Sequence, residues 1–246
     1  MDLYSFPPIA AVLQAAYGAL MGLADLLAPL AGPSAAALAV VVVTLLVRAA
    51  LIPTGIAQAK ADRLRSRLAP KLRALQERHR KNPERLQRET MKLYADEKAS
   101  PFAGCLPVLI QAPIVGVIYS VFLHASIAGH ANALLTEELA GVPLGTSVAG
   151  SVVHGALDPA TAVVFGAIVA VLVIVAEITR RVCRPKTTDA PAPGMPDLRW
   201  LGVLQFATAV VALFVPLAAA LYLVVTVTWT LVQRIVLRRR FPLHGG

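Results

Sequence analysis

Long apolar runs separated by polar segments dominate the chain and determine its class. A helix rises 1.5 Å per residue, so about 20 apolar residues cross the roughly 30 Å hydrocarbon core of a bilayer. Runs of this length occur at residues 34–56, 106–125 and 160–179. The last run, residues 200–237, is too long for one span and contains Pro216, which would break a helix interior. We therefore predict five spans, the last two forming a tight hairpin.

The more polar segments predict two further helical regions. Residues 8–29 carry Gln14 and Asp25 and are expected to form an interfacial helix on the outer surface. Between the first two spans, apolar residues recur at helical spacing on either side of an Asn82-Pro83 turn, which favours an antiparallel helical hairpin. The stripes expected to pack are Leu64, Leu68, Leu72 and Leu75, then Leu86, Met91, Leu93 and Tyr94.

The predicted fold class is an all-α membrane protein with five transmembrane helices. Its segments are an N-terminal region with the interfacial helix (1–33), the first span (34–56), the hairpin (57–101), the second span (102–125), a loop (126–159), the third span (160–179), a second loop (180–199), the fourth and fifth spans (200–215 and 216–237) and a basic tail (238–246).

Composition and charge support this class and assign an orientation. The chain is 57% hydrophobic and only 15% charged, which excludes an ordinary soluble domain. Lys and Arg are absent before Arg48, crowded between residues 60 and 98, absent from residues 125–159, and present again from Arg180 onward. The positive-inside rule therefore predicts an outer N-terminus and a cytoplasmic C-terminus, which requires an odd number of spans.

No residue pattern indicates chemical catalysis. The two cysteines are far apart, and His124, His130 and His154 lack the spacing of metal ligands, so we expect no metal and no cofactor. Neither a Ser-His-Asp set, nor paired carboxylates at membrane depth, nor a phosphate-binding glycine loop is present. The chain is therefore not expected to be an enzyme.

Arg48 is the leading functional candidate, because it is a permanent cation within an apolar run. An Arg near the centre of a membrane helix costs about 2.5–3.5 kcal/mol on insertion scales, so such residues usually face a polar cavity or a partner. The alternative is that the side chain snorkels to the cytoplasmic interface. Glu177 could pair with Arg48, but we favour a position at the interface beside Arg180 and Arg181.

Three segments resemble one known family. TLLVRAALIP (residues 44–53), KNPERLQRETMKLY (81–94) and SPFAGCLPVLIQAPIVGVIY (100–119) occur in the order and spacing of the YidC/Oxa/Alb membrane insertases. The resemblance extends over nearly the whole chain. In the second half, Ala218 and Val227 stand where the family has glycine and asparagine, which indicates a divergent bacterial paralogue.

The resemblance implies an insertase and chaperone of the bacterial plasma membrane, with a hydrophilic groove open to the cytoplasm and the inner leaflet. Arg48 would keep this groove hydrated and attract acidic residues of a client protein. Polar side chains of membrane helices tend to face the bundle interior, so further residues are candidates to line the groove. They are Thr44, Gln111, Gln205, Thr226, Thr228, Trp229 and Gln233. The alternative for each is a local hydrogen bond between helices or an interfacial anchor.

The implied partners are newly made membrane proteins, with the Sec translocon and the ribosome as further candidates. The short tail argues against strong ribosome tethering. The basic hairpin is either a solvated connector or a docking surface for anionic lipids or a partner, and no nucleic-acid recognition motif accompanies its charge. Two other functions stay open: a small transporter or channel that uses Arg48 as an anion site, and a membrane assembly scaffold.

Overall fold

The computed structural model describes residues 7–80, 82–97, 106–127, 129–182 and 206–240. The chain divides into two compact units. The first unit contains residues 1–49 and 113–231, and the second contains residues 50–112 and 232–246.

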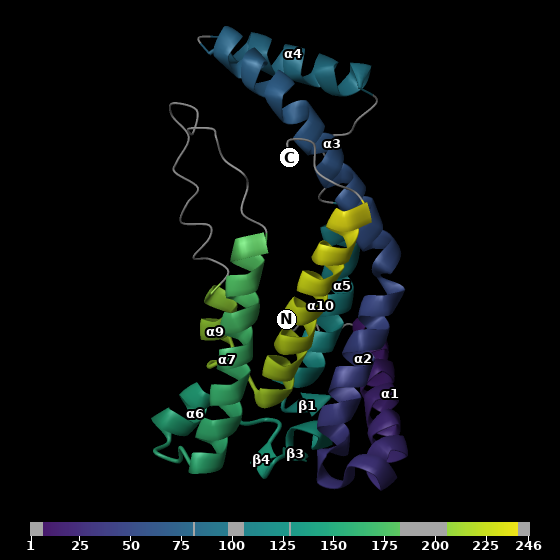
Figure 1. Cartoon of the computed structure of the whole chain (residues 1–246). Helices are drawn as coiled ribbons and strands as arrows, with labels where there is room; N and C mark the ends of the chain where they lie inside the picture. The colour runs from purple at the N-terminus through teal and green to yellow at the C-terminus, as the bar shows by residue number, and fades with distance from the viewer. Residues whose placement is uncertain (1–6, 81, 98–105, 128, 183–205, 241–246) are drawn as a thin grey trace. The chain divides into compact units, whose positions relative to one another are not determined.

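The described part of the chain is mainly helical (Figure 1). The principal helices are α1 (Pro7–Ala31), α2 (Ala35–Ala50), α3 (Ile52–Arg78), α4 (Pro83–Asp96), α5 (Leu106–Leu123), α7 (Pro159–Val182) and α10 (Leu217–Arg240). Shorter helices are η2 (Gly32–Ser34), η3 (Ala133–Leu135), α6 (Val148–Val153) and α9 (Ala207–Val211). Two small antiparallel ladders pair β1 (Ser126–Ile127) with β2 (His130–Ala131), and β3 (Glu138–Leu139) with β4 (Val142–Pro143).

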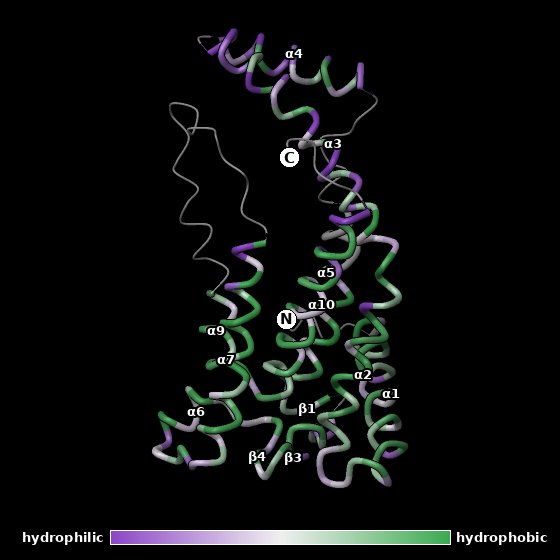
Figure 2. The backbone as a smooth tube through the Cα atoms, viewed as in Figure 1, coloured by the Kyte–Doolittle hydropathy of each residue, from purple (hydrophilic) through white to green (hydrophobic). Residues whose placement is uncertain are grey.

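Three helical stretches in the described residues are long and apolar enough to cross a membrane. They are Pro8–Ala50, which includes α1, η2 and α2, then Pro159–Val182 and Leu217–Arg240. Ala112–Leu123 is a shorter apolar helix. Figure 2 shows apolar residues along α7 and α10, and many more polar ones along α3 and α4. The protein is therefore an all-α membrane protein.

Helix α7 of the first unit turns one face inward. In α7 the buried residues recur every three or four positions, as a helix with a single packed face requires. Phe165 and Leu172 on this face join a core that also contains Phe122 of α5 and Tyr222 of α10. Leu13 and Leu20 of α1 belong to the same core. These helices form the apolar interior of the first unit.

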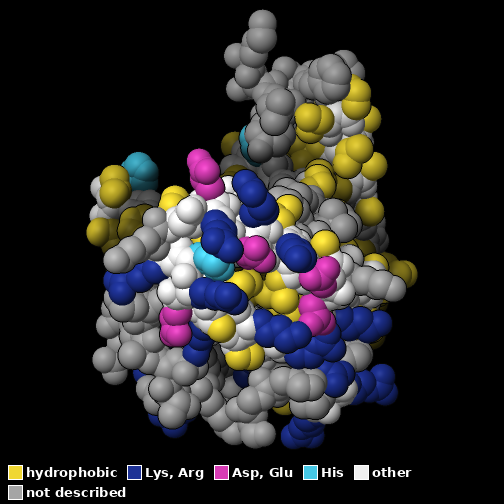
Figure 3. All heavy atoms as spheres, turned by 90° about the horizontal axis from the view of Figure 1, so that it is seen from above, with side chains coloured by type: hydrophobic (Ala, Val, Ile, Leu, Met, Phe, Trp, Pro, Cys, Tyr) yellow, Lys and Arg dark blue, Asp and Glu magenta, His cyan; other side chains and the backbone are white. Residues whose placement is uncertain are grey.

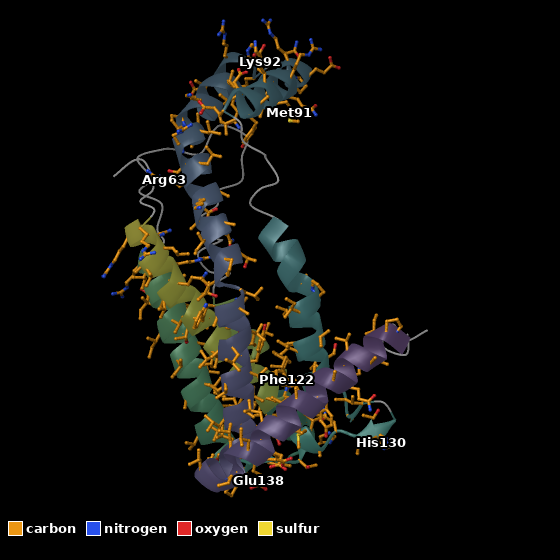
Figure 4. The ribbon with its side chains drawn as sticks, turned by 90° about the vertical axis from the view of Figure 1, so that its right-hand side faces the viewer. Arg63, Met91, Lys92, Phe122, His130 and Glu138 are labelled. Carbon is orange, nitrogen blue, oxygen red and sulfur yellow. The ribbon has the colours of Figure 1, made fainter. Side chains whose placement is uncertain are left out.

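The segment between α5 and α7 is more structured than the loop predicted from the sequence. It holds both ladders, η3 and α6, and Leu134, Val142 and Leu144 are fully buried within it. Figure 4 shows His130 and Glu138 on its strands, while Phe122 lies among the helices. Strands of two residues give no alternating pattern long enough to detect, so the sequence did not predict them.

This segment provides partners for helix ends that would otherwise carry unpaired backbone groups. The Asn132 side-chain amide donates to the carbonyls of Val121 and His124, at 2.7 and 2.9 Å, and so caps the last turn of α5. At the start of α10, the backbone N–H groups of Leu217 and Ala218 donate to carbonyls of the same segment, those of Thr146 and Leu144, at 2.8 and 2.9 Å. The segment therefore fixes the ends of two long helices.

The second unit contains α3 and α4, which follow the turn expected from Asn82-Pro83. The Asn82 side chain accepts a hydrogen bond from the Arg85 N–H at 3.0 Å, as a helix N-cap does. Both Arg67 and Lys71, in the middle of α3, form ion pairs with Glu97, directly after α4. These pairs bring the end of α4 back to α3. In the space-filling view, Lys and Arg side chains with a few carboxylates among them are scattered across the middle of the visible face (Figure 3).

Two boundaries differ from the sequence prediction. The helix expected over residues 34–56 is divided at Leu51, whose φ and ψ of −87° and 5° are not helical, and α3 begins at Ile52. Pro53 explains the break, since proline is favoured in the first turn of a new helix. Within the expected span 200–215, the described residues contain only the short helix α9.

The apolar stripe predicted for α4 was wrong at one residue. Met91 is 54% exposed, whereas Leu86 and Leu93 are partly buried. One face of α4 and the residue after it contains Leu86, Leu93 and Glu97, which follow one another by about two turns and one turn. Met91 lies outside that face. Met91 and Lys92 are labelled on α4 in Figure 4.

We predict that Asn132→Ala destabilises the protein by about 1–3 kcal/mol, because the buried Val121 carbonyl and the partly buried His124 carbonyl lose their donor. Thermal unfolding of the purified protein in detergent measures the change. Thr136→Ala is the matched control, since this exposed hydroxyl of the same segment bonds only the nearby Ala133 carbonyl. Equal effects of the two variants would contradict the capping role of Asn132.

The Glu97 ion pairs predict a loss of α3–α4 docking in acid. Hydrogen bonds from Lys71 and then from Arg67 hold the pKa of Glu97 below its usual value. Because the pKa of Glu97 is lower in the folded protein, its ion pairs stabilise the hairpin fully above the unfolded-state pKa of about 4.3. This stabilisation is lost as the pH falls through the folded-state pKa. Spin labels on exposed Ala74 and Met91 should therefore give a broader distance distribution below about pH 4.

Glu97→Gln should produce the same broadening at neutral pH, whereas Glu84→Gln, at the exposed start of α4, should not. A distance distribution that Glu97→Gln leaves unchanged would show that the ion pairs do not hold the two helices together.

Candidate functional site

Arg48 lies on the inward face of α2. Val40 and Thr44, two turns and one turn before it on the same face, are 0% and 1% exposed. The outward face carries Leu45 and Leu46, which are 40% and 62% exposed. Arg48 itself is partly buried. Arg48 therefore shares the helix face of the buried residues Val40 and Thr44, opposite the exposed Leu45 and Leu46.

The Arg48 guanidinium has no ion-pair or hydrogen-bond partner among the residues that the structure describes. Glu177, the carboxylate considered as its partner, instead accepts hydrogen bonds from Arg180 at 2.7 and 2.8 Å and from Arg181 at 2.6 Å. These contacts place Glu177 beside Arg180 and Arg181, as expected, while its position at the membrane interface stays a prediction. Among the described residues, Arg48 is thus a partly buried cation without a carboxylate partner.

Thr44 is fully packed and has a local hydrogen bond. Its hydroxyl donates to the Val40 carbonyl at 2.6 Å within the same helix. Because the side chain is 1% exposed and its donor is satisfied, Thr44 fits a packing role better than a lining role.

The polar residues predicted on α10 divide between two faces. Thr226 and Trp229 follow Tyr222 by four and seven positions, so the three share one helix face, whereas Thr228 lies on another. The Thr226 hydroxyl oxygen is buried and has no hydrogen-bond partner in the described residues. A buried hydroxyl without a partner is costly, so this oxygen is a candidate to bind water or a client.

Tyr222 was not among the predicted site residues, although its position one turn before Thr226 could have identified it. It is 4% exposed, and its ring lies 6.1 Å from that of Phe122 on α5, with the ring planes tilted by 54°. This aromatic contact joins α5 to α10 next to the unpaired hydroxyl.

Gln233 belongs to the second unit and packs against α3. A methyl group added to Gly55 would lie only 1.6 Å from the Gln233 side-chain nitrogen, so glycine allows this close approach. Such an environment fits a helix-to-helix contact, which was the alternative considered for Gln233. The small residue at position 55 is the feature that the sequence analysis missed.

The two other glutamines cannot be placed within the site. Gln111 lies on α5, of which the structure describes the backbone at that position, and Gln205 lies outside the described residues. Among the described residues, no group of three or more His, Cys, Asp or Glu side chains is arranged to hold a metal ion.

The fold and the composition define a multi-pass, all-α membrane protein. Its sequence matches the profile of the 60Kd inner membrane proteins over residues 27–244, and the chain belongs to that family.

Similar proteins named Membrane protein insertase YidC occur in several bacteria. The protein of Streptomyces avermitilis is 26% identical over 225 residues, which cover 85% of this chain and 52% of the relative. The protein of Clostridium perfringens is 43% identical over 79 residues, covering 32% of this chain and 33% of the relative. The protein of Pasteurella multocida is 43% identical over 94 residues, covering 38% and 17%. The chain thus matches about half or less of each relative's length.

The Gly55–Gln233 contact predicts an effect of side-chain size. Gly55→Ala should be nearly neutral, because the end of Gln233 can swing aside, whereas Gly55→Leu should destabilise the protein by about 1–3 kcal/mol through overpacking. Thermal unfolding in detergent measures both. Gly116→Leu is the control, since no atom lies within 4 Å of the methyl position there.

A double-mutant cycle separates the contact from other effects of Gly55→Leu. Shortening Gln233 to Ala should recover at least part of the lost stability, giving a coupling of about 0.5–3 kcal/mol. Strictly additive effects would contradict the packing of Gln233 on Gly55.

Proposed function

We propose that the protein is a membrane insertase and chaperone, which receives hydrophilic segments of small membrane proteins in a hydrated groove and releases their apolar segments into lipid. The single observation that carries the proposal is Arg48, a cation on the inward face of α2 with no ion-pair partner in the described residues. A charge at this depth is costly without hydration or a partner. A client's acidic segment together with groove water would supply both.

Arg48 acts electrostatically in this mechanism. The guanidinium keeps water within the membrane and attracts carboxylates of an entering segment, so the segment stays hydrated over part of its path. The hydrocarbon thickness that the client segment still has to cross is smaller than the full membrane core. Arg48 lies about 14 residues, or about 21 Å, from the predicted outer end of its helix. No covalent step and no cofactor is required.

Polar groups on other helices would line the same groove. Thr226 is the strongest candidate, because its buried oxygen has no partner in the described residues. Trp229 shares its face of α10, and Gln111, Gln205 and Thr228 remain candidates from the sequence. Thr44 would support the groove through packing, since its described hydrogen bond lies within α2. Gln233 packs on Gly55 of α3 within the second unit.

The proposed topology has five spans, with the N-terminus outside and the C-terminus in the cytoplasm of a bacterial cell. The distribution of Lys and Arg supports this orientation. The α3–α4 hairpin would lie in the cytoplasm, and its basic face suits anionic lipids or a partner such as the Sec translocon. The α5–α7 segment would close the outer side, which agrees with its caps on α5 and α10.

Arg48→Ala should lower the insertion rate of a single-span client with an acidic tail by about tenfold or more in proteoliposomes, because a hydrogen bond to a charged group contributes about 1.5–3 kcal/mol. Arg48→Lys should retain part of the rate, since it keeps the charge. Protease protection of the client measures insertion, and a client whose tail carries no acidic residues should depend less on Arg48.

Leu46→Ala is the control, because it truncates an exposed residue on the outward face of the same helix. Normal insertion by both Arg48 variants would exclude the electrostatic mechanism. Site-specific crosslinks from α2 and α10 to stalled clients test the insertase function itself, and ion flux without crosslinks would instead favour a channel.

A further inference from the structure

An apolar patch lies exposed at the α6 end of the first unit. Its members are Val152 and Val153 of α6, Leu157 in the following turn, and Phe214 between α9 and α10, with exposed fractions of 58%, 81%, 46% and 67%. We call these four residues the α6 patch. A backbone hydrogen bond from Ala149 to the Leu213 carbonyl, at 3.0 Å, joins α6 to the turn that holds Phe214. The patch is therefore built on connected backbone.

The α6 patch adjoins the lipid-facing side of a spanning helix. On α7, opposite its buried stripe, Val163, Val171, Ile174 and Ile178 are 71%, 40%, 57% and 39% exposed, at spacings of eight, three and four residues. In a membrane protein this stripe is covered by lipid. Helix α6 packs against α7, and so does α9, which adds exposed Val210 and Val211. In Figure 1, α6 lies at the end of α7 where that helix begins.

The charged residue closest to the patch indicates its depth. Asp158 directly precedes α7, and its carboxylate accepts a hydrogen bond from the Thr161 N–H at 3.3 Å. The hydrogen bonds to Thr161 lower the pKa of Asp158, so the group is ionised at neutral pH and requires water or headgroups. Val163, the first exposed residue of the apolar stripe on α7, is only about 7.5 Å further along the helix. The α6 patch thus lies at the boundary between headgroups and acyl chains.

The composition of this region identifies hydrocarbon as the partner. No residue of α6 is charged, and residues 125–159 contain no Lys or Arg to attract anionic headgroups. Four bulky apolar side chains exposed to water would be unfavourable, whereas burial in the acyl boundary gains about 25 cal/mol for each Å² removed from water.

We propose that the α6 patch is a monotopic lipid anchor, which dips into the outer leaflet beside α7 and holds the α5–α7 segment against the membrane surface. This anchor is independent of the groove and of any client. Because α6 is tied to the turn before α10, and the same segment caps that helix, the anchor would fix the start of α10 at a constant depth.

The test measures the depth of single spin labels on the full chain in phosphatidylcholine liposomes. Cys105 and Cys183 are first replaced by Ser, and labels are attached through Val153→Cys and Phe214→Cys. Both residues are more than half exposed, so labelling should leave the fold intact. Val163→Cys is the lipid control, and Glu138→Cys, exposed on β3 of the same segment, is the water control.

Labels at Val153 and Phe214 should be more accessible to oxygen than to a water-soluble nickel complex, as at Val163, and the label at Glu138 should show the reverse. Adding phosphatidylglycerol or salt should not alter the result, because no cation contributes. Accessibility to nickel as high as at Glu138 would overturn the proposal. Exclusion of both reagents would also overturn it, since a protein partner would then cover the patch.

Discussion

The requirement that backbone polar groups find partners away from water governs this structure. Within a helix the requirement is met internally, but the last carbonyls and the first N–H groups remain unpaired at each end. Here the segment between α5 and α7 supplies the missing partners. The Asn132 side chain donates hydrogen bonds to the carbonyls of Val121 and His124. The carbonyls of Leu144 and Thr146 accept hydrogen bonds from the first N–H groups of α10. Two long helices thereby end at one structured layer.

Two side-chain groups differ from these paired backbone groups in their hydrogen bonding. The Arg48 cation faces inward on α2, and the Thr226 oxygen is buried on α10, each without a hydrogen-bond partner in the described part of the chain. A protein that provides partners for its helix ends has no structural reason to retain an unpaired cation. Such groups are retained where water or a client protein completes them, which is why the insertase proposal depends on them.

The second unit depends on different interactions. Few of its described residues are buried, and the buried apolar ones are Ala61 and Leu68. Its helices are joined by turn chemistry at Asn82 and by the ion pairs of Glu97, which are exposed and therefore weak individually. A hairpin held in this way can separate at low cost. The described contacts of the second unit are thus local turn chemistry, exposed ion pairs and the packing of Gln233 on Gly55.

The sequence by itself determined the fold class, the family, the positions of α7 and α10, and Arg48 as the residue to explain, because apolar length and an isolated charge are properties of single segments. It also indicated Pro216 as the break between the last two spans, since proline acts locally. Only the tertiary structure decided that Thr44 is packed, that Gln233 rests on Gly55, that Met91 faces outward, and that Asn132 caps α5. These outcomes depend on which residues distant in sequence meet, and periodicity along one helix does not contain that information.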